Sequence, residues 1–275
     1  MIKRIKVIGL FVMLAFLCCG CDVIHASTTR DIRHSGFSLS GAELICDALL
    51  KDPDYDKVKF LTGKHAITES GILYELSVGQ KYSNEQHCMA SSLTQKVVAL
   101  FDENIVKTDD GKYHYIVRSG ENAAYTVVPT SDSNYMIIDA IMRDSQVLKV
   151  KTVDASAGHY YVLKKDGNVY NYVVAKTHNS ATVVSSPVVY SKSNYQGDII
   201  DFSYAGKASG TSVRTTSQIF RMMATNKEEC SKYVDVACEY EMRLDEGLTK
   251  HQSEILGFSG TYLITTYGKQ FNAGA

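Results

Sequence analysis

One cysteine and one histidine in this chain have the setting that nucleophilic chemistry requires. Cys88 opens a predicted helix over residues 85–101, whose apolar residues recur at helical spacing, and His159 opens a short alternating stretch typical of a strand. A helix N-terminus lowers the pKa of a thiol, and a nearby histidine can accept the thiol proton. Asn168 or Asn171 could then hold the imidazole in one orientation.

This combination resembles the catalytic groups of papain-like cysteine hydrolases, which implies a hydrolase or deamidase that uses Cys88 and His159. Two observations weigh against it. His159 takes the place that His65, Tyr113 and Tyr262 take elsewhere in an internal repeat, and Cys88 has a candidate disulfide partner. A residue type that is set by periodic packing needs no catalytic explanation. We therefore expect a protein without enzymatic activity and keep the hydrolase as the alternative.

Other kinds of chemical site are not indicated. No pair of histidines or cysteines has the close spacing of a zinc site, and Asp-Gly at 110–111 and 166–167 is more typical of hairpin turns than of calcium loops. After removal of residues 1–20, the chain contains 26 Lys and Arg residues and 30 Asp and Glu residues, and its sequence has no basic stripe. The sequence therefore predicts neither a metal nor a cofactor, and no nucleic-acid partner.

The first twenty residues have the pattern of an export signal. Lys3, Arg4 and Lys6 precede an apolar stretch over residues 7–17, which is too short to span a bilayer as a helix. The following "LCCGCD" resembles a bacterial lipobox, which implies cleavage before Cys21 and acylation of that residue. A plain secretory cut after Ala26 is the competing hypothesis, and it would give a secreted protein. We expect an exported protein that is anchored in the membrane at the cell envelope, periplasmic or on the surface, with residues 21–36 as a tether.

Four cysteines remain in the exported chain, an even number in an oxidising compartment, so we expect disulfides among Cys46, Cys88, Cys230 and Cys238. Three pairings are open, and Cys46–Cys88 with Cys230–Cys238 is favoured because both are local. On one continuous helix, residues 230 and 238 would lie about 12 Å apart, too far to bond. The second pair therefore requires a turn between them.

A strand-turn-strand pattern recurs along the chain. "GHYYVLKKDGNVY", which begins at Gly158, has relatives that begin at residues 63, 111, 210 and 260, at intervals of 48, 47, 52 and 50 residues. Each copy alternates in polarity and contains residues suited to tight turns, and a Tyr or Phe follows each turn. One such hairpin cannot bury its apolar face alone, whereas five arranged about an axis can.

The copy at residue 158 resembles the regulator-of-chromosome-condensation repeat, and residues 58–83 resemble a blade of tachylectin, a sugar-binding propeller. The resemblance implies a mainly β fold, a five-unit β-propeller-like domain over residues 37–275. We expect short helical insertions: a capped helix over 37–54, the helix over 85–101, a short helix or strand pair over 134–153, and a charged departure over 228–254.

Recognition of a ligand at the protein surface remains the expected role. The loops of such a scaffold would bind a partner protein of the envelope, a secreted protein or a glycan, in adhesion, secretion or delivery of a toxin. Four tyrosines that the alternation does not place wholly inside are the candidate contact residues: Tyr160, Tyr172, Tyr190 and Tyr195.

Overall fold

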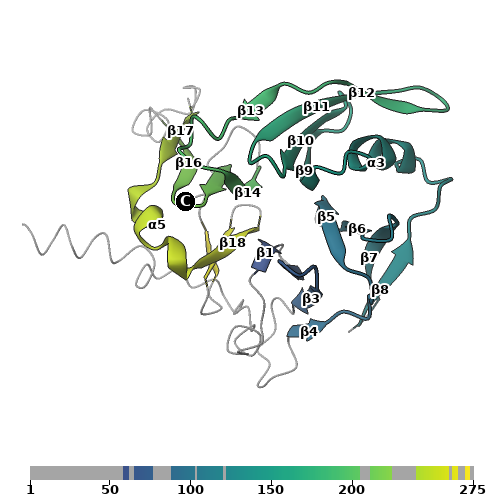
Figure 1. Ribbon diagram of the computed structural model, residues 1–275, viewed down its shortest axis with the longest axis horizontal. Helices are drawn as coiled ribbons and strands as arrows, with labels where there is room; N and C mark the ends of the chain where they lie inside the picture. Colours follow the sequence, from purple (N-terminus) through teal and green to yellow (C-terminus); the bar gives the residue numbers. More distant parts are fainter. Residues whose placement is uncertain are drawn as a thin grey trace, which may run out of the picture. The chain divides into compact units, whose positions relative to one another are not determined.

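The computed structural model (Figure 1) describes residues 58–61, 65–76, 88–102, 104–119, 122–204, 211–224, 240–259, 262–265 and 270–272. These residues all belong to the compact unit Leu39–Ala275. The predicted signal, the tether, the helix over 37–54 and the cysteines at 21, 46, 230 and 238 lie outside the described residues. Among the residues described, no helix is long and apolar enough to cross a membrane.

The strands follow one another in antiparallel meanders, in which each strand except β12 pairs with the next in the chain. The first meander comprises β1 (Val58–Leu61), β2 (His65–Thr68), β3 (Leu73–Leu76) and β4 (Cys88–Ala90). The second comprises β5 (Val97–Phe101), β6 (Ile105–Thr108), β7 (Tyr113–Ser119) and β8 (Asn122–Val127). The third comprises β9 (Val147–Asp154), β10 (His159–Lys164), β11 (Val169–Lys176), β12 (Ala181–Ser185) and β13 (Val188–Tyr190), and β12 and β13 both pair with β11.

The fourth meander comprises β14 (Ile199–Ser203), β15 (Ser212–Thr215), β16 (Ile219–Ala224) and β17 (Tyr240–Leu244). The fifth comprises β18 (Ile255–Ser259), β19 (Tyr262–Thr265) and β20 (Gln270–Asn272). We call the first strand of each meander its leading strand; these are β1, β5, β9, β14 and β18. The described residues are therefore mainly β, as predicted.

Successive meanders contact one another. The Val97 N–H at the start of β5 donates to the Gly71 carbonyl in the first meander, and β5 pairs in parallel with β9. The Ile199 N–H at the start of β14 donates to the Gly167 carbonyl of the third meander. Finally, β14 contacts β18, and β18 contacts β1. This order of contacts is that of a propeller-like fold, which confirms the predicted fold class; the count of five blades stays a prediction.

The hairpin between the second and third strands is built in the same way in three meanders. Its turn glycine has a positive φ and donates its N–H to the carbonyl of the residue that ends the second strand: Gly71 to Thr68, Gly111 to Thr108, and Gly167 to Lys164. A glycine fits there because other residues are strained at positive φ. Asp109-Asp110-Gly111 is thus a hairpin turn, as the sequence predicted.

The predicted register of the repeat is wrong in the second meander. Gly111 was expected to open a copy, but it lies in the turn of one, so that His114 occupies the place of Tyr74 and Tyr170 in the other meanders. The equal intervals expected from sequence do not hold, because the leading strands begin at residues 58, 97, 147, 199 and 255. Helix α3 (Tyr135–Met142) follows the second meander and lengthens that interval.

The predicted helix over 85–101 is also wrong where the structure describes it. Residues 88–90 form β4 and residues 97–101 form β5. The β-branched pair Val97-Val98 and the aromatic Phe101 favour a strand, and pairing with β6 and β9 outweighs their helical spacing. The stretch 134–153 forms α3 followed by most of β9, and the described end of 228–254 holds β17, the short helix α5 (Glu246–Lys250) and a 3-10 turn (Gln252–Glu254). Short helical insertions are therefore confirmed.

Helix α3 contacts β11 and β12 (Figure 1). Three tyrosines of the strands form hydrogen bonds with the segment that contains this helix. Each phenol donates a hydrogen bond to an aspartate of that segment: Tyr113 to Asp139 at 3.2 Å, Tyr115 to Asp132 at 2.8 Å, and Tyr172 to Asp144 at 2.8 Å. Burial and the neighbouring carboxylate raise the pKa of Tyr115 to about 12, so the phenol keeps the proton that it donates. Many of the tyrosines are thus structural residues.

Asp144 should make the stability of this segment depend on pH. Burial alone would raise its pKa, but hydrogen bonds from Lys164, the Gln146 N–H and Tyr172 outweigh burial and hold the pKa below its ordinary value. A lowered folded-state pKa stabilises the protein above the unfolded-state pKa of about 4 and loses that effect as pH falls through the folded-state value.

We expect Asp144→Asn to lower the free energy of unfolding by about 1–2 kcal/mol at pH 7, with the difference from the unsubstituted protein shrinking as pH falls below about 4. Urea unfolding at a series of pH values measures this difference. Asp198→Asn is the control, because that carboxylate is more than half exposed and its ion pair with Lys192 is a surface pair. A deficit of Asp144→Asn that is the same at pH 3 and pH 7 would contradict the assignment.

Candidate functional site

Every leading strand contains a β-bulge at its second residue. The pairing with the second strand skips one residue near the start of the leading strand in all five meanders: Lys59, Val98, Leu148, Ile200 and Leu256. A bulge leaves one residue unpaired and re-aims its side chain, and bulges are frequent next to binding sites. The same ends of five strands therefore present side chains that the sheet pairing does not use.

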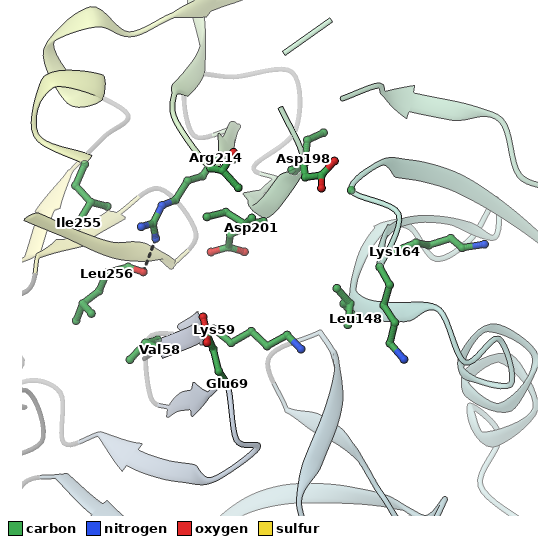
Figure 2. Close-up of a pocket in the computed structure, with 15 residues that line it drawn as sticks. Val58, Lys59, Glu69, Leu148, Lys164, Asp198, Asp201, Arg214, Ile255 and Leu256 are labelled. Carbon is green, nitrogen blue, oxygen red and sulfur yellow. Dashed lines mark hydrogen bonds between the residues drawn. The ribbon is translucent and has the colours of Figure 1, made fainter. Parts of the chain in front are cut away.

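A cavity of about 770 Å³ lies at these bulged ends. Four of the five bulged residues line it, together with residues of the turns and strand starts: Val58, Lys59, Glu69, Leu148, Lys164, Lys165, Gly167, Asp198, Ile199, Ile200, Asp201, Arg214, Thr216, Ile255 and Leu256. Figure 2 shows Arg214, Asp201 and Leu256 near one another, with the Lys59 side chain reaching toward Leu148. The volume is in the range of sites that bind small ligands or short segments.

Two charged residues occupy a repeat position that is uncharged in the other leading strands. The residue after the bulge is Phe60, Ala99, Lys149, Asp201 and Gly257 in the five meanders, taken in order. Lys149 donates to the Asp201 carboxylate at 2.6 Å and to the Phe202 carbonyl at 2.9 Å. The two side chains are 8% and 3% exposed, so this ion pair is buried and links β9 to β14.

Arg214 occupies another position that is aliphatic in three of the other four meanders. Its counterparts in the second strands are Ile67, Lys107, Leu163 and Ile264, of which Ile67 and Leu163 are fully buried. Arg214 lies directly across from Asp201 in the strand pairing, and its Nη1 donates to the Leu256 carbonyl at 2.7 Å. Burial lowers the pKa of Arg214, an effect that the Asp201 charge opposes.

Lysines add positive charge to the same cavity. Burial, and then the charge of Lys165, lower the pKa of Lys59, whereas Glu69 acts in the opposite direction. Lys164 and Asp198 are each held in ion pairs, at 2.9 Å with Asp144 and 3.1 Å with Lys192. Within the residues that the structure describes, Lys59, Lys165 and Arg214 form no ion pair.

The four candidate tyrosines do not line this cavity. Tyr160, Tyr172 and Tyr190 are 4%, 5% and 8% exposed, so the expectation that their side chains reach solvent is wrong. The Tyr160 ring packs against Phe101, and the Tyr190 ring packs against Tyr161 and Tyr195. Tyr195 is half-buried, and its ring lies 4.7 Å from that of Phe220. Packing within and between meanders therefore explains these residue types.

The structure removes the physical basis of the Cys88–His159 hypothesis. Cys88 lies in β4, paired with Leu76, and not at the start of a helix that would lower the pKa of its thiol. His159 does contact Asn171, with Nδ1 3.1 Å from the amide nitrogen, as the hypothesis required. The predicted equivalence of His159 and His65 in the repeat is wrong, because the strand pairing aligns His65 with Tyr161.

A metal site is also without support in this part of the molecule. In the described ranges, no three side chains of His, Cys, Asp or Glu gather closely enough to hold an ion.

No protein-family model matches the chain. No curated protein matches it either. Among solved structures, YCF48 from Cyanidioschyzon merolae is similar over 76% of this chain and 63% of that protein, with 12% identity and a TM-score of 0.33. The chain thus matches less than two thirds of the length of that protein. The strand pairing and the contacts between meanders show the propeller-like fold by themselves.

The sequence contained a signal for this site that the predicted repeat did not use. Four of the five second strands end in threonine, at residues 68, 108, 215 and 265. Aligning the second strands on this threonine places Arg214 in a column with Ile67, Lys107 and Ile264. A charge in a repeat position that is mostly apolar is typical of a functional or structurally special site.

Proposed function

We propose that this protein is a non-catalytic binding module that recognises a partner protein through the cavity at the bulged ends of its leading strands. It is exported and held at the cell envelope by a lipid on Cys21. The observation that carries the proposal is the lining of the cavity, where aliphatic side chains alternate with charged ones. Such a mixture is typical of surfaces that bind protein segments.

The lining favours a protein segment over a glycan. Among the described residues that line the cavity, none is aromatic, whereas aromatic rings are the groups that stack on sugars. The aliphatic residues Leu148, Ile200 and Leu256 can instead make apolar contacts with Leu, Ile or Val side chains of a partner. Ile200, the bulged residue of β14, is 37% exposed, so its side chain is accessible to a partner.

A photoreactive amino acid at position 200 tests this proposal in the cells that make the protein. We expect discrete protein adducts from position 200 and none from position 184, where Val184 is 61% exposed but does not line the cavity. The adducts should be found in the membrane fraction and should move to the soluble fraction when Cys21→Ser removes the lipid. Absence of adducts at position 200, or equal adducts at both positions, contradicts binding at the cavity. Adducts that stay in the membrane fraction after Cys21→Ser contradict the proposed lipid anchor but not binding at the cavity.

A further inference from the structure

We infer that the partner segment bound by the cavity presents a carboxylate to Arg214, flanked by aliphatic side chains. This inference rests on the proposed function and names the chemistry of its ligand.

Among the described residues, the charges around Asp201 do not balance. Lys149 and Asp201 neutralise each other at 2.6 Å, which leaves the guanidinium of Arg214 as a second cation beside one carboxylate. Its Nε is buried and, among the described residues, has no hydrogen-bond partner. An arginine that is removed from water is costly unless an anion or several acceptors pair with it. The Leu256 carbonyl satisfies one of its N–H groups only.

Packing of the fold does not require an arginine at this position. Ile67 and Leu163 fill the equivalent position in the first and third meanders and are 1% and 0% exposed. An aliphatic residue there would bury the same face without the desolvation of a charge. The guanidinium has five donors in a planar fork, which matches a carboxylate in a bidentate arrangement. Its presence at the cavity therefore points to an acidic ligand group.

The surroundings extend the same chemistry. Lys59 and Lys165 lie at the cavity and, in the described residues, form no ion pair, so they would attract an acidic segment as it approaches. The bulged residues Leu148, Ile200 and Leu256 supply apolar contacts beside the charged groups. A small inorganic anion would use the cations alone, whereas an acidic and aliphatic peptide uses both kinds of residue.

Isothermal titration calorimetry with three peptides tests whether the ligand needs a carboxylate and whether a side chain or the chain end supplies it. Acetyl-Leu-Glu-Leu-Glu-Leu-amide carries side-chain carboxylates, acetyl-Leu-Gln-Leu-Gln-Leu with a free terminus carries only a terminal carboxylate, and the amide of the latter carries none. We expect one of the acidic peptides to bind at least about tenfold more tightly than the neutral one. Which of the two binds better identifies the side chain or the chain end as the source of the carboxylate.

Arg214→Leu should remove this preference while it leaves the fold intact, because leucine is the residue of the equivalent position in the third meander. The variant should unfold at a temperature no lower than the unsubstituted protein and bind the acidic and neutral peptides equally. Ile200→Ser should weaken all three peptides. Arg243→Leu, which removes an exposed arginine of β17 outside the cavity, is the control and should change neither property.

The outcomes distinguish the inference from the proposed function. Equal binding of all three peptides, weakened by Ile200→Ser, would leave the cavity as a peptide site and overturn the carboxylate. Retained preference in Arg214→Leu, or a marked loss of its thermal stability, would assign Arg214 to the fold and also overturn the inference. Failure of every peptide to bind overturns it as well, and the adducts at position 200 then decide whether the cavity binds a protein at all.

Discussion

Asp201→Asn is expected to lower the free energy of unfolding by about 3–5 kcal/mol. Asp201 is 2% exposed and accepts a hydrogen bond from Lys149, and Arg214 lies across from it in the neighbouring strand. Replacing the carboxylate with an amide leaves the buried Lys149 ammonium without its counter-charge and the half-buried Arg214 without the carboxylate across from it. Breaking one partner of a buried ion pair is far more costly than replacing both, because the remaining charge is desolvated and unpaired.

Asp198→Asn is the matched control for this substitution. Asp198 lines the same cavity, but its side chain is 60% exposed and its ion pair with Lys192 is a surface pair, so we expect a loss below about 1 kcal/mol. The double variant Asp201→Leu with Lys149→Leu should recover part of the stability, because it removes both charges of the pair and leaves only the half-buried Arg214 without a carboxylate. Urea unfolding measures all three. Equal losses for Asp201→Asn and Asp198→Asn would show that the buried pair does not have the role assigned to it.

Gly71→Ala is expected to be the second most damaging of these changes, with a loss of about 2–5 kcal/mol. Gly71 has φ +89°, and its carbonyl accepts a hydrogen bond from the Val97 N–H of the next meander. A Cβ at this position would lie 2.8 Å from the Val97 carbonyl oxygen, closer than real Cβ atoms come. Since the obstacle is backbone, the first and second meanders must move apart to admit the methyl group.

Gly111→Ala is the control that measures the cost of a positive φ in such a turn without a steric clash. Gly111 has φ +84° in the equivalent turn of the second meander, and a Cβ there would have no neighbour within 4 Å. We expect it to cost only the strain of positive φ, about 1–2 kcal/mol. The free energy of unfolding from thermal or urea denaturation gives both values. If the two glycine substitutions cost the same, the close approach of the first two meanders is not supported.

The fold class followed from the sequence because its signals are local. Alternating polarity and residues suited to turns, such as Asp166-Gly167, specify hairpins directly, and their recurrence indicates assembly about an axis. The error in the second meander arose because period-two alternation looks the same in every hairpin. It cannot tell the pair β6–β7 from the pair β7–β8. The predicted helix at 85–101 failed because pairing of β5 with β9, distant in sequence, decides the structure there.

The candidate site could not be predicted in the same way. A β-bulge depends on the register between two strands and leaves no sequence pattern of its own, so the exposure of Ile200 was not foreseen. Aromatic residues were expected at the binding surface, yet Tyr160 and Tyr190 pack in the core. The pairing of Lys149 with Asp201 joins residues 52 positions apart in different meanders, which only the assembled fold reveals.

Methyl NMR of the protein labelled at Ile, Leu and Val tests the central claim most directly, which is that the bulged ends of the leading strands form the binding surface. The probe is the acidic leucine peptide described above. The account predicts that its addition shifts the methyl resonances of Leu148, Ile200 and Leu256 and leaves those of Val117 and Val184, which are exposed elsewhere, unchanged. Shifts confined to Val117 and Val184, or spread evenly over both sets, would contradict it.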